Sequence, residues 1–303
     1  MLTWLKGIIP PLTTPFQESG KVWAKALEAE IDFHIACGAE GICVTGSTGE
    51  GAGLSPDEIF EIASIAVKHT RGRVPVIGGL IPDTTDEATV MGLAAKKAGV
   101  KALQVTPPHY LFQPDAQGFV EYYSRIREAA DLPVILYNVI PWAQVNAEAI
   151  AQLIDAGAVD GIKQSGANLH LLADLLYRFG KKIPILSAVD DLLLPSFVLG
   201  APGAVAAIVT VLPKESVGLY QAVQRGDLAH ALEFHHKLLV VWQALEGTQG
   251  FHARIKYALE LQGRQAGLPR HPQRPASPAD RARVTQALRE AGIATVEMTE
   301  IRK

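Results

Sequence analysis

Residues 156–163, with the sequence Ala-Gly-Ala-Val-Asp-Gly-Ile-Lys, join the end of a helical stretch to a short apolar run. Gly157 can adopt the left-handed backbone conformation that ends a helix. The run after it is typical of a strand that is buried on both faces of a parallel sheet. The same pattern begins at Ala36, at Ala98 and at Leu199. A recurring unit of helix, glycine and strand indicates an α/β fold.

Further apolar runs fill the gaps between these units and bring the candidate strands before residue 210 to eight. Helical stretches lie between the strands. The stretch from Ser55 to Lys68 opens with Ser-Pro-Asp-Glu, a capping box with proline at the first helical position. Eight alternations of strand and helix predict a (β/α)8 TIM barrel, with a doubly wound parallel sheet as the alternative. The further runs begin at Gly7, Val74, Pro133 and Ile183.

The part of the chain from Lys214 onward has no strand-like run. We therefore predict a barrel over residues 1–212 and a C-terminal helical region over residues 213–303. A proline-rich connector divides the last helix from those before it. The helices are expected at 214–225, 227–245, 253–261 and 282–290, with the connector at 269–278.

The composition restricts the class of protein. Charged residues make up 19% of the 303 residues, hydrophobic residues 48%, and the formal net charge is −3, which excludes a disordered chain and a basic surface for nucleic acid. Cys37 and Cys43 are too few for a disulfide framework and fit a reduced compartment. Residues 192–213 are uncharged and long enough to span a bilayer, but their prolines and glycines predict an interrupted helix followed by a strand. We expect a cytoplasmic protein with no nucleic-acid and no membrane partner.

Lys163 is the most conspicuous polar residue in a predicted strand. The functional side chains of a TIM barrel lie at the carboxyl ends of its strands. A buried ammonium group is unfavourable, and desolvation would lower its pKa and free the amine to attack a carbonyl carbon, giving a Schiff base. The alternative is a lysine just past the strand that pairs with an acid. Other polar residues at or near strand ends are Thr13, Thr14, residues 45–50, Thr106, Tyr137 and Ser187.

Tyr137 ends the apolar run Pro133-Val-Ile-Leu-Tyr-Asn, and only one helix lies between it and the strand of Lys163. Adjacent barrel strands would place these two side chains next to each other. A tyrosine hydroxyl can then transfer a proton as general acid or base. The alternative is an aromatic ring that fills a layer of the core.

A turn rich in glycine and hydroxyl groups, Gly46-Ser-Thr-Gly-Glu-Gly51, follows another strand. The exposed N–H groups of such a turn can bind a carboxylate or a phosphate. Glu50 could act as a base or cap a helix start. Asp190 and Asp191 follow the seventh strand and could contact a polar substrate or form a solvated pair. Trp142 could line a binding site or pack under its own loop.

Three motifs in order, Gly-Ser-Thr-Gly-Glu at 46–50, Tyr-Asn-Val at 137–139 and Gly-Ile-Lys at 161–163, resemble the dihydrodipicolinate synthase / N-acetylneuraminate lyase family. The opening at 7–16 and the glycine pair at 200–203 also match. The resemblance spans about residues 7–274. It implies a (β/α)8 barrel with a C-terminal helical domain, and a tetramer built from two tight dimers. It also implies class I aldolase chemistry on pyruvate or another 2-oxo acid, without metal or organic cofactor.

The resemblance implies a role for each matching residue. Lys163 would form the Schiff base, Tyr137 would shuttle the proton, and Ser47 would link that tyrosine to solvent. Thr48 and the backbone N–H groups of the turn, including that of Gly49, would hold the carboxylate of the 2-oxo acid. The further expected substrate-binding residues are Val205, through its backbone carbonyl, Trp142 and Asp191.

Three departures from the family pattern concern the second substrate. Residues 139–144 contain no arginine, whereas dihydrodipicolinate synthases bind the carboxylate of their aldehyde with one. The paired tyrosines after the fourth strand are replaced at 106–112, where His109 or Tyr110 could complete the proton relay of a neighbouring subunit, and we favour Tyr110. Residues 78–82 also differ from the usual pattern. We expect a family member other than a true dihydrodipicolinate synthase, with an apolar or aromatic second substrate near Trp142.

The leading hypothesis is a Schiff-base-forming carbon–carbon lyase, aldolase or hydratase-aldolase that acts on pyruvate or another 2-oxo acid plus an unidentified aldehyde. One alternative is a non-catalytic 2-oxo acid binder that serves as a sensor. Another is a true 4-hydroxy-tetrahydrodipicolinate synthase despite the missing arginine. A third is a barrel enzyme whose Ser-Thr-Gly turn binds a phosphorylated substrate.

Overall fold

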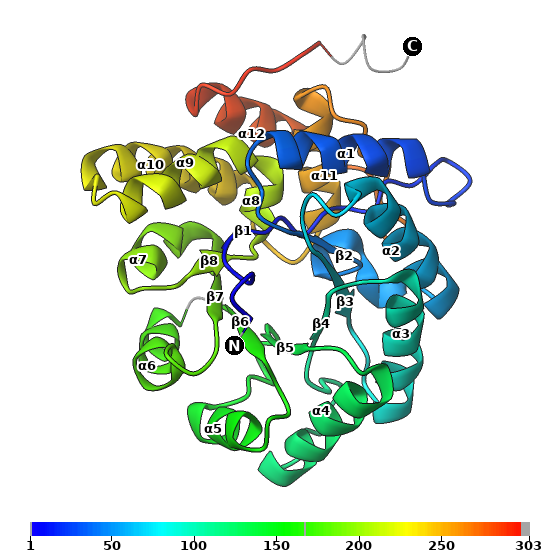
Figure 1. Ribbon diagram of the computed structural model, residues 1–303. Helices are drawn as coiled ribbons and strands as arrows, with labels where there is room; N and C mark the ends of the chain where they lie inside the picture. Colours follow the sequence, from blue (N-terminus) through cyan, green and yellow to red (C-terminus); the bar gives the residue numbers. More distant parts are fainter. Residues whose placement is uncertain (1, 167, 298–303) are drawn as a thin grey trace.

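The computed structural model describes residues 2–166 and 168–297 and contains one sheet of eight parallel strands. The strand order is β1-β8-β7-β6-β5-β4-β3-β2, and an isolated parallel bridge between Pro11 and Cys43 closes the ring between β1 and β2. Figure 1 shows the strands at the centre with helices around them. The predicted TIM barrel is confirmed, and the doubly wound sheet was the wrong alternative. The strands are β1 (Gly7–Ile8), β2 (Ile42–Val44), β3 (Val76–Leu80), β4 (Ala102–Val105), β5 (Val134–Asn138), β6 (Gly161–Ser165), β7 (Ile185–Ala188) and β8 (Gly203–Ala204).

Two helix ends show the sequence signals clearly, whereas α12 begins at Pro278, four residues before its predicted start. Ser55 and Glu58 form both hydrogen bonds of the predicted capping box at the start of α2. Gly99 ends α3 with a φ of 91°, in the left-handed region that glycine adopts without strain. The helices are α1 (Ala24–Ala36), α2 (Pro56–Thr70), α3 (Thr85–Ala98), α4 (Ala116–Ala130), α5 (Ala147–Asp155), α6 (Leu169–Phe179), α7 (Leu193–Val198), α8 (Ala207–Val211), α9 (Pro213–Gln224), α10 (Leu228–Leu245), α11 (Phe251–Leu261) and α12 (Pro278–Glu290). Three 3₁₀ turns are η1 (Ser47–Gly49), η2 (Gly51–Gly53) and η3 (Asp190–Leu192).

Two apolar layers lie on the two sides of the strands. Ile135 belongs to the inner cluster that fills the barrel, whereas Leu136 and Ile162 belong to the outer cluster between strands and helices. Successive side chains of a strand point to opposite faces, so Tyr137 and Lys163 face the barrel interior. The inner cluster contains Leu5, Ile9, Cys43, Ile77, Ala102, Ile135, Leu186 and Val205.

The C-terminal part of the described chain is helical, and α9 to α12 confirm the predicted helices there. The helix α9 packs against β1 and α7, and α10 packs against α9 and α12. The division after residue 212 stays a prediction, and residues 298–303 of the predicted helical region lie outside the described residues. The uncharged segment 192–213 contains the predicted helix and strand as α7 and β8, but β8 is short and the helix α8, which was not predicted, follows it. Within the described ranges, no helix is long and apolar enough to cross a membrane.

Candidate active site

Tyr137 and Lys163 face each other across β5 and β6. The register of the two strands pairs them directly, as the strand order predicts. The Nζ atom of Lys163 lies 3.7 Å from the centroid of the Tyr137 ring, and both side chains are buried. The face of an aromatic ring attracts an ammonium group, which offsets part of the loss of hydration. The buried lysine therefore has a stabilising neighbour that also carries a hydroxyl group.

Ser47 joins this pair from the end of β2. The Tyr137 hydroxyl donates a hydrogen bond to Ser47 Oγ over 3.2 Å. Two linked hydroxyl groups can transfer a proton between a buried reaction centre and the exterior. The structure thus brings together the three residues that we expect to be catalytic within one chain, and their roles stay predictions.

The turn after β2 has an unusual backbone. Its 3₁₀ turn, η1, lies between Thr45 and Glu50, which have φ angles of 59° and 61°. Such left-handed conformations are strained in non-glycine residues and need support from their surroundings. Thr48 is buried within the turn. The Gly49 N–H donates to Gly46 O at 2.9 Å. A carboxylate that also accepts from the Gly49 N–H, as we expect, would therefore form a bifurcated hydrogen bond with it.

Glu50 forms a buried ion pair. Its Oε1 lies 2.7 Å from Lys256 Nζ on α11, and its Oε2 accepts a hydrogen bond of 2.9 Å from the backbone N–H of Arg270. Its side chain makes no capping hydrogen bond at the start of η2. Lys256 Nζ also donates to Thr14 O at 2.9 Å. Glu50 therefore connects the turn to the C-terminal helices, which neither the base nor the cap hypothesis anticipated.

Asp190 is a titratable group beside Lys163 that sequence reasoning passed over in favour of Asp191. Burial raises the pKa of Asp190 to about 7, although the Ile208 N–H bond and the Lys163 ammonium lower it. The bond from Ile208 N to Asp190 Oδ1 is 2.7 Å long. Asp191 is half-buried, and its charge acts on His235 of α10. Both follow β7 directly, so position alone could have indicated either one.

Tyr110 and Trp142 are exposed in the single chain, whereas Tyr137 and Lys163 are buried. Tyr110 is 72% exposed and Trp142 is 67% exposed. Trp142 Nε1 donates to His109 O at 2.8 Å, and Asp83 Oδ1 accepts from the backbone N–H groups of His109 and Tyr110. Trp142 thus bonds to the preceding loop, between β4 and α4, instead of packing under its own. The two loops are tied together, while both rings remain open to solvent.

Val205 lies inside the barrel. Its side chain belongs to the buried inner cluster, and its N–H donates to Ser187 O at 2.9 Å. The backbone carbonyl that we expect to contact the substrate follows directly after β8. Its role stays a prediction.

A buried lysine with a tyrosine and a serine at the strand ends of a TIM barrel is the arrangement that a lysine-dependent aldolase or lyase requires. The model of the Dihydrodipicolinate synthetase family matches residues 4–291, and the chain belongs to this family of class I aldolases.

Relatives cover nearly the whole chain. The 4-hydroxy-tetrahydrodipicolinate synthase of Thermodesulfovibrio yellowstonii is 32% identical over 95% of this chain and 99% of the relative. YagE from E. coli K12, solved in complex with pyruvate, is 28% identical, with a TM-score of 0.91 over 96% of this chain and 99% of that one. CdNal from Clostridium difficile, solved in complex with mannosamine, is 26% identical, with a TM-score of 0.86 over 95% of this chain and 99% of that one.

Proposed function

We propose that this enzyme forms or cleaves a carbon–carbon bond between pyruvate, or another 2-oxo acid, and an aldehyde through a Schiff base on Lys163. The observation that carries the proposal is the Lys163 ammonium against the Tyr137 ring, with the Tyr137 hydroxyl bonded to Ser47. The solved complex of YagE with pyruvate supports the choice of the first substrate.

The chemistry follows from these three side chains. The neutral amine of Lys163 attacks the 2-oxo carbon to give a carbinolamine. The Tyr137 hydroxyl then gives its proton to the hydroxyl group that leaves as water, so that an iminium ion and a tyrosinate are formed. The iminium withdraws electrons, so the adjacent carbon releases a proton to the Tyr137 oxygen and becomes a nucleophile. This carbon attacks the aldehyde carbon, the aldehyde oxygen takes up the proton, and water then hydrolyses the new iminium. Cleavage runs through the same steps in reverse.

The carboxylate of the 2-oxo acid binds at the turn of Ser47 and Thr48. A hydroxyl group and backbone N–H groups held by the fold stabilise a carboxylate without rearrangement during the reaction. The carbonyl of Val205, which follows β8, also contacts the bound acid. No resident metal or organic cofactor takes part in this scheme.

The second substrate is an aldehyde other than that of a true dihydrodipicolinate synthase. Residues 139–144 contain no arginine, and they include Ile140 and the exposed Trp142. These side chains suit an apolar or aromatic group better than a carboxylate. Asp191 then contacts a polar group of that substrate.

A true 4-hydroxy-tetrahydrodipicolinate synthase is the second candidate. The name of the Thermodesulfovibrio yellowstonii relative and its 32% identity favour it. It requires that another cation replace the missing arginine.

The active assembly is a homotetramer made of two tight dimers. Tyr110, Leu111 and Phe112 form one exposed apolar loop with exposed fractions of 70% or more, beside Trp142. Adjacent exposed apolar side chains of this kind are typical of an interface. Tyr110 from the partner subunit completes the proton relay in this arrangement, with His109 as the alternative. The cytoplasmic location also stays a prediction.

Steady-state assays with pyruvate and a panel of aldehydes test the proposal. We expect turnover with apolar or aromatic aldehydes and little with an aldehyde that carries a carboxylate. The opposite preference would favour the synthase. No turnover with any aldehyde in either direction would contradict both candidates and leave the non-catalytic binder.

A further inference from the structure

The helix α11 reaches the Ser47 turn with two side chains one helical turn apart. His252 Nε2 lies 2.8 Å from Ser47 O, and Lys256 Nζ lies 2.7 Å from Glu50 Oε1. Residues four apart lie on the same face of a helix. Because a carbonyl oxygen only accepts hydrogen bonds, His252 Nε2 carries the proton and donates it. One face of α11 therefore holds both ends of η1.

The contacts from α11 offset strain in the backbone of the turn. Thr45 and Glu50, on the two sides of η1, have left-handed conformations that make the turn unfavourable by itself. Thr45 Oγ1 donates to Gly79 O at 2.8 Å and Thr14 Oγ1 donates to Gly49 O at 2.7 Å, so the barrel supplies some of the hydrogen bonds. Within the turn, the Glu50 N–H donates to Ser47 O at 3.1 Å. The C-terminal part of the chain supplies the second and shorter hydrogen bond to Ser47 O and the ion pair with the Glu50 carboxylate.

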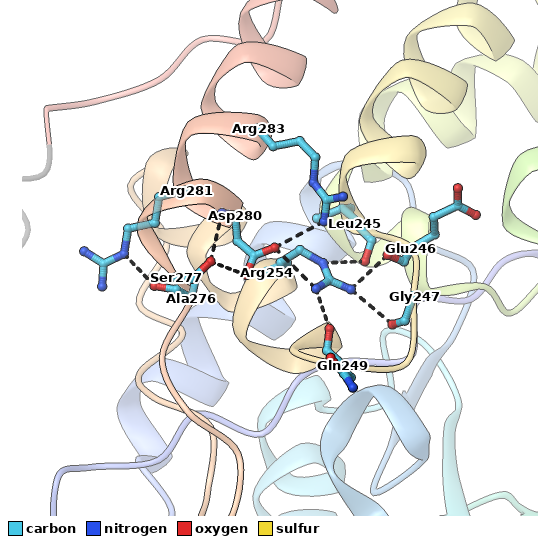
Figure 2. Close-up of polar contacts among 10 residues, drawn as sticks. All are labelled: Leu245, Glu246, Gly247, Gln249, Arg254, Ala276, Ser277, Asp280, Arg281 and Arg283. Atoms are coloured by element: carbon cyan, nitrogen blue, oxygen red, sulfur yellow. Dashed lines mark hydrogen bonds and ion pairs between the residues drawn. The ribbon is translucent and has the colours of Figure 1, made fainter.

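The first turn of α11, which carries His252, is itself fixed by Arg254. Figure 2 shows the Arg254 guanidinium among the carbonyl groups of the loop that precedes the helix, with Asp280 of α12 on another side. Its donors reach the carbonyl oxygens of Leu245, Glu246, Gly247 and Gln249. Gly250 before the helix provides no side-chain cap. Arg254 thus fixes this loop and the first turn of α11, and with it the position from which His252 reaches Ser47.

We propose that His252 is a positioning residue for the 2-oxo acid site and acts through the carbonyl group of Ser47; this rests on the proposed function. The Ser47 C=O and the Thr48 N–H belong to one planar trans peptide group and point in opposite directions. The hydrogen bond from His252 therefore fixes the Thr48 N–H so that it points away from α11, and it restrains Ser47 beside Tyr137. Neither effect requires His252 to touch the substrate.

Three variants of His252 and one control variant of the same helix test the proposal. His252→Leu removes the hydrogen bond, His252→Asn shortens the side chain so that it no longer reaches Ser47, and His252→Gln places an amide N–H near the position of Nε2. Tyr257→Phe is the matched control, because it removes the 3.2 Å hydrogen bond to Thr285 Oγ1 of α12 from the same helix. The readouts are the pyruvate concentration for half-maximal trapping by borohydride, the turnover rate, and the circular dichroism of each variant.

We expect His252→Leu and His252→Asn to raise the half-maximal pyruvate concentration about three- to tenfold, the effect typical of one lost hydrogen bond. His252→Gln should restore most of the loss, and Tyr257→Phe should match the wild type. If His252→Leu does not fold, the comparison of His252→Asn with His252→Gln carries the test. Wild-type values in the Leu and Asn variants, no rescue by Gln, or an equal shift in Tyr257→Phe would overturn the proposal. Failure of the wild-type enzyme to trap any 2-oxo acid would instead contradict the proposed function.

Discussion

Lys163 Nζ lies 3.7 Å from the centre of the Tyr137 ring, and the two residues occupy paired positions on β5 and β6. Both are held by strands in the middle of the sheet, so their relative position does not depend on a loop. Catalytic groups need fixed geometry to be effective, and rigid elements provide it. This pair is therefore the structural basis of the proposed chemistry.

Tyr137→Phe should slow turnover about 10²- to 10⁴-fold, the contribution typical of general acid–base catalysis. The ring that faces Lys163 remains, so formation of the Schiff base with pyruvate should change little. Steady-state rates and borohydride trapping on the same preparation measure the two effects separately. A parallel loss of trapping and turnover would argue against a proton-transfer role for the Tyr137 hydroxyl.

Asp190 should make the enzyme less stable as the pH rises toward neutrality. Its pKa is about 7 in the folded chain against an ordinary value of 3.8, so the fold favours the protonated form. The stability that this provides is complete below pH 3.8, falls progressively as the pH rises, and is lost once the pH has passed about 7. Asp190→Asn should remove this loss, and thermal unfolding between pH 5 and 9 checks it. Identical pH profiles of wild type and variant would show that Asp190 does not titrate in this way.

His34 and Glu30 on α1 should determine the stability in acid. The pKa of His34 falls from 6.5 to about 4, mainly because the ring is buried and partly because of the Arg264 guanidinium, although Glu30 opposes this shift. The unfolded chain therefore binds a proton between pH 6.5 and 4 that the folded chain excludes. Burial alone would raise the pKa of Glu30, but Arg264 and His34 lower it to about 2, so a second loss of stability begins below pH 4.5.

His34→Gln should remove the loss of stability between pH 6.5 and 4 and keep the loss that begins below pH 4.5. The first loss is on the order of 3 kcal/mol in free energy of unfolding, at about 1.4 kcal/mol per pKa unit. Urea unfolding at pH 7, 5.5 and 4 provides the measurement. A variant that loses as much stability as the wild type between pH 6.5 and 4 would disprove the assignment.

Phe112→Asp should weaken the assembly. Phe112 is 87% exposed in the single chain, and a charge at the centre of an apolar interface is unfavourable. Light scattering after size-exclusion chromatography should show the molecular mass falling by about half or more, as expected if a dimer interface of this kind is lost. Val90→Asp on α3, at a residue that is 52% exposed, is the control and should leave the mass unchanged. An unchanged mass for Phe112→Asp would place the interface elsewhere.

The fold could be predicted because it rests on local signals. Apolar runs, glycine stops such as Gly99 and the capping box at Ser55 each act within a few residues. Strand order then placed Tyr137 beside Lys163. Local patterns could not tell Asp190 from Asp191, because the direction of each side chain depends on how η3 packs between β7 and α10.

The contacts behind the Ser47 turn were missed for a different reason. His252 and Ser47 are 205 residues apart in the chain, and Lys256 and Glu50 come from the same two segments. Neither the composition of the chain nor the spacing of its residues indicates such pairs, because they form only when α11 packs against the barrel. The exposed loop at Tyr110 poses the same problem, because its proposed partner is a second copy of the chain.

Trapping of the Schiff base tests the central claim most directly. The enzyme is incubated with pyruvate and sodium borohydride, and the site of the reduced adduct is mapped by mass spectrometry of proteolytic peptides. The account predicts one adduct per chain, located on Lys163, and none in Lys163→Met. An adduct on another lysine, or one that persists in Lys163→Met, would contradict it.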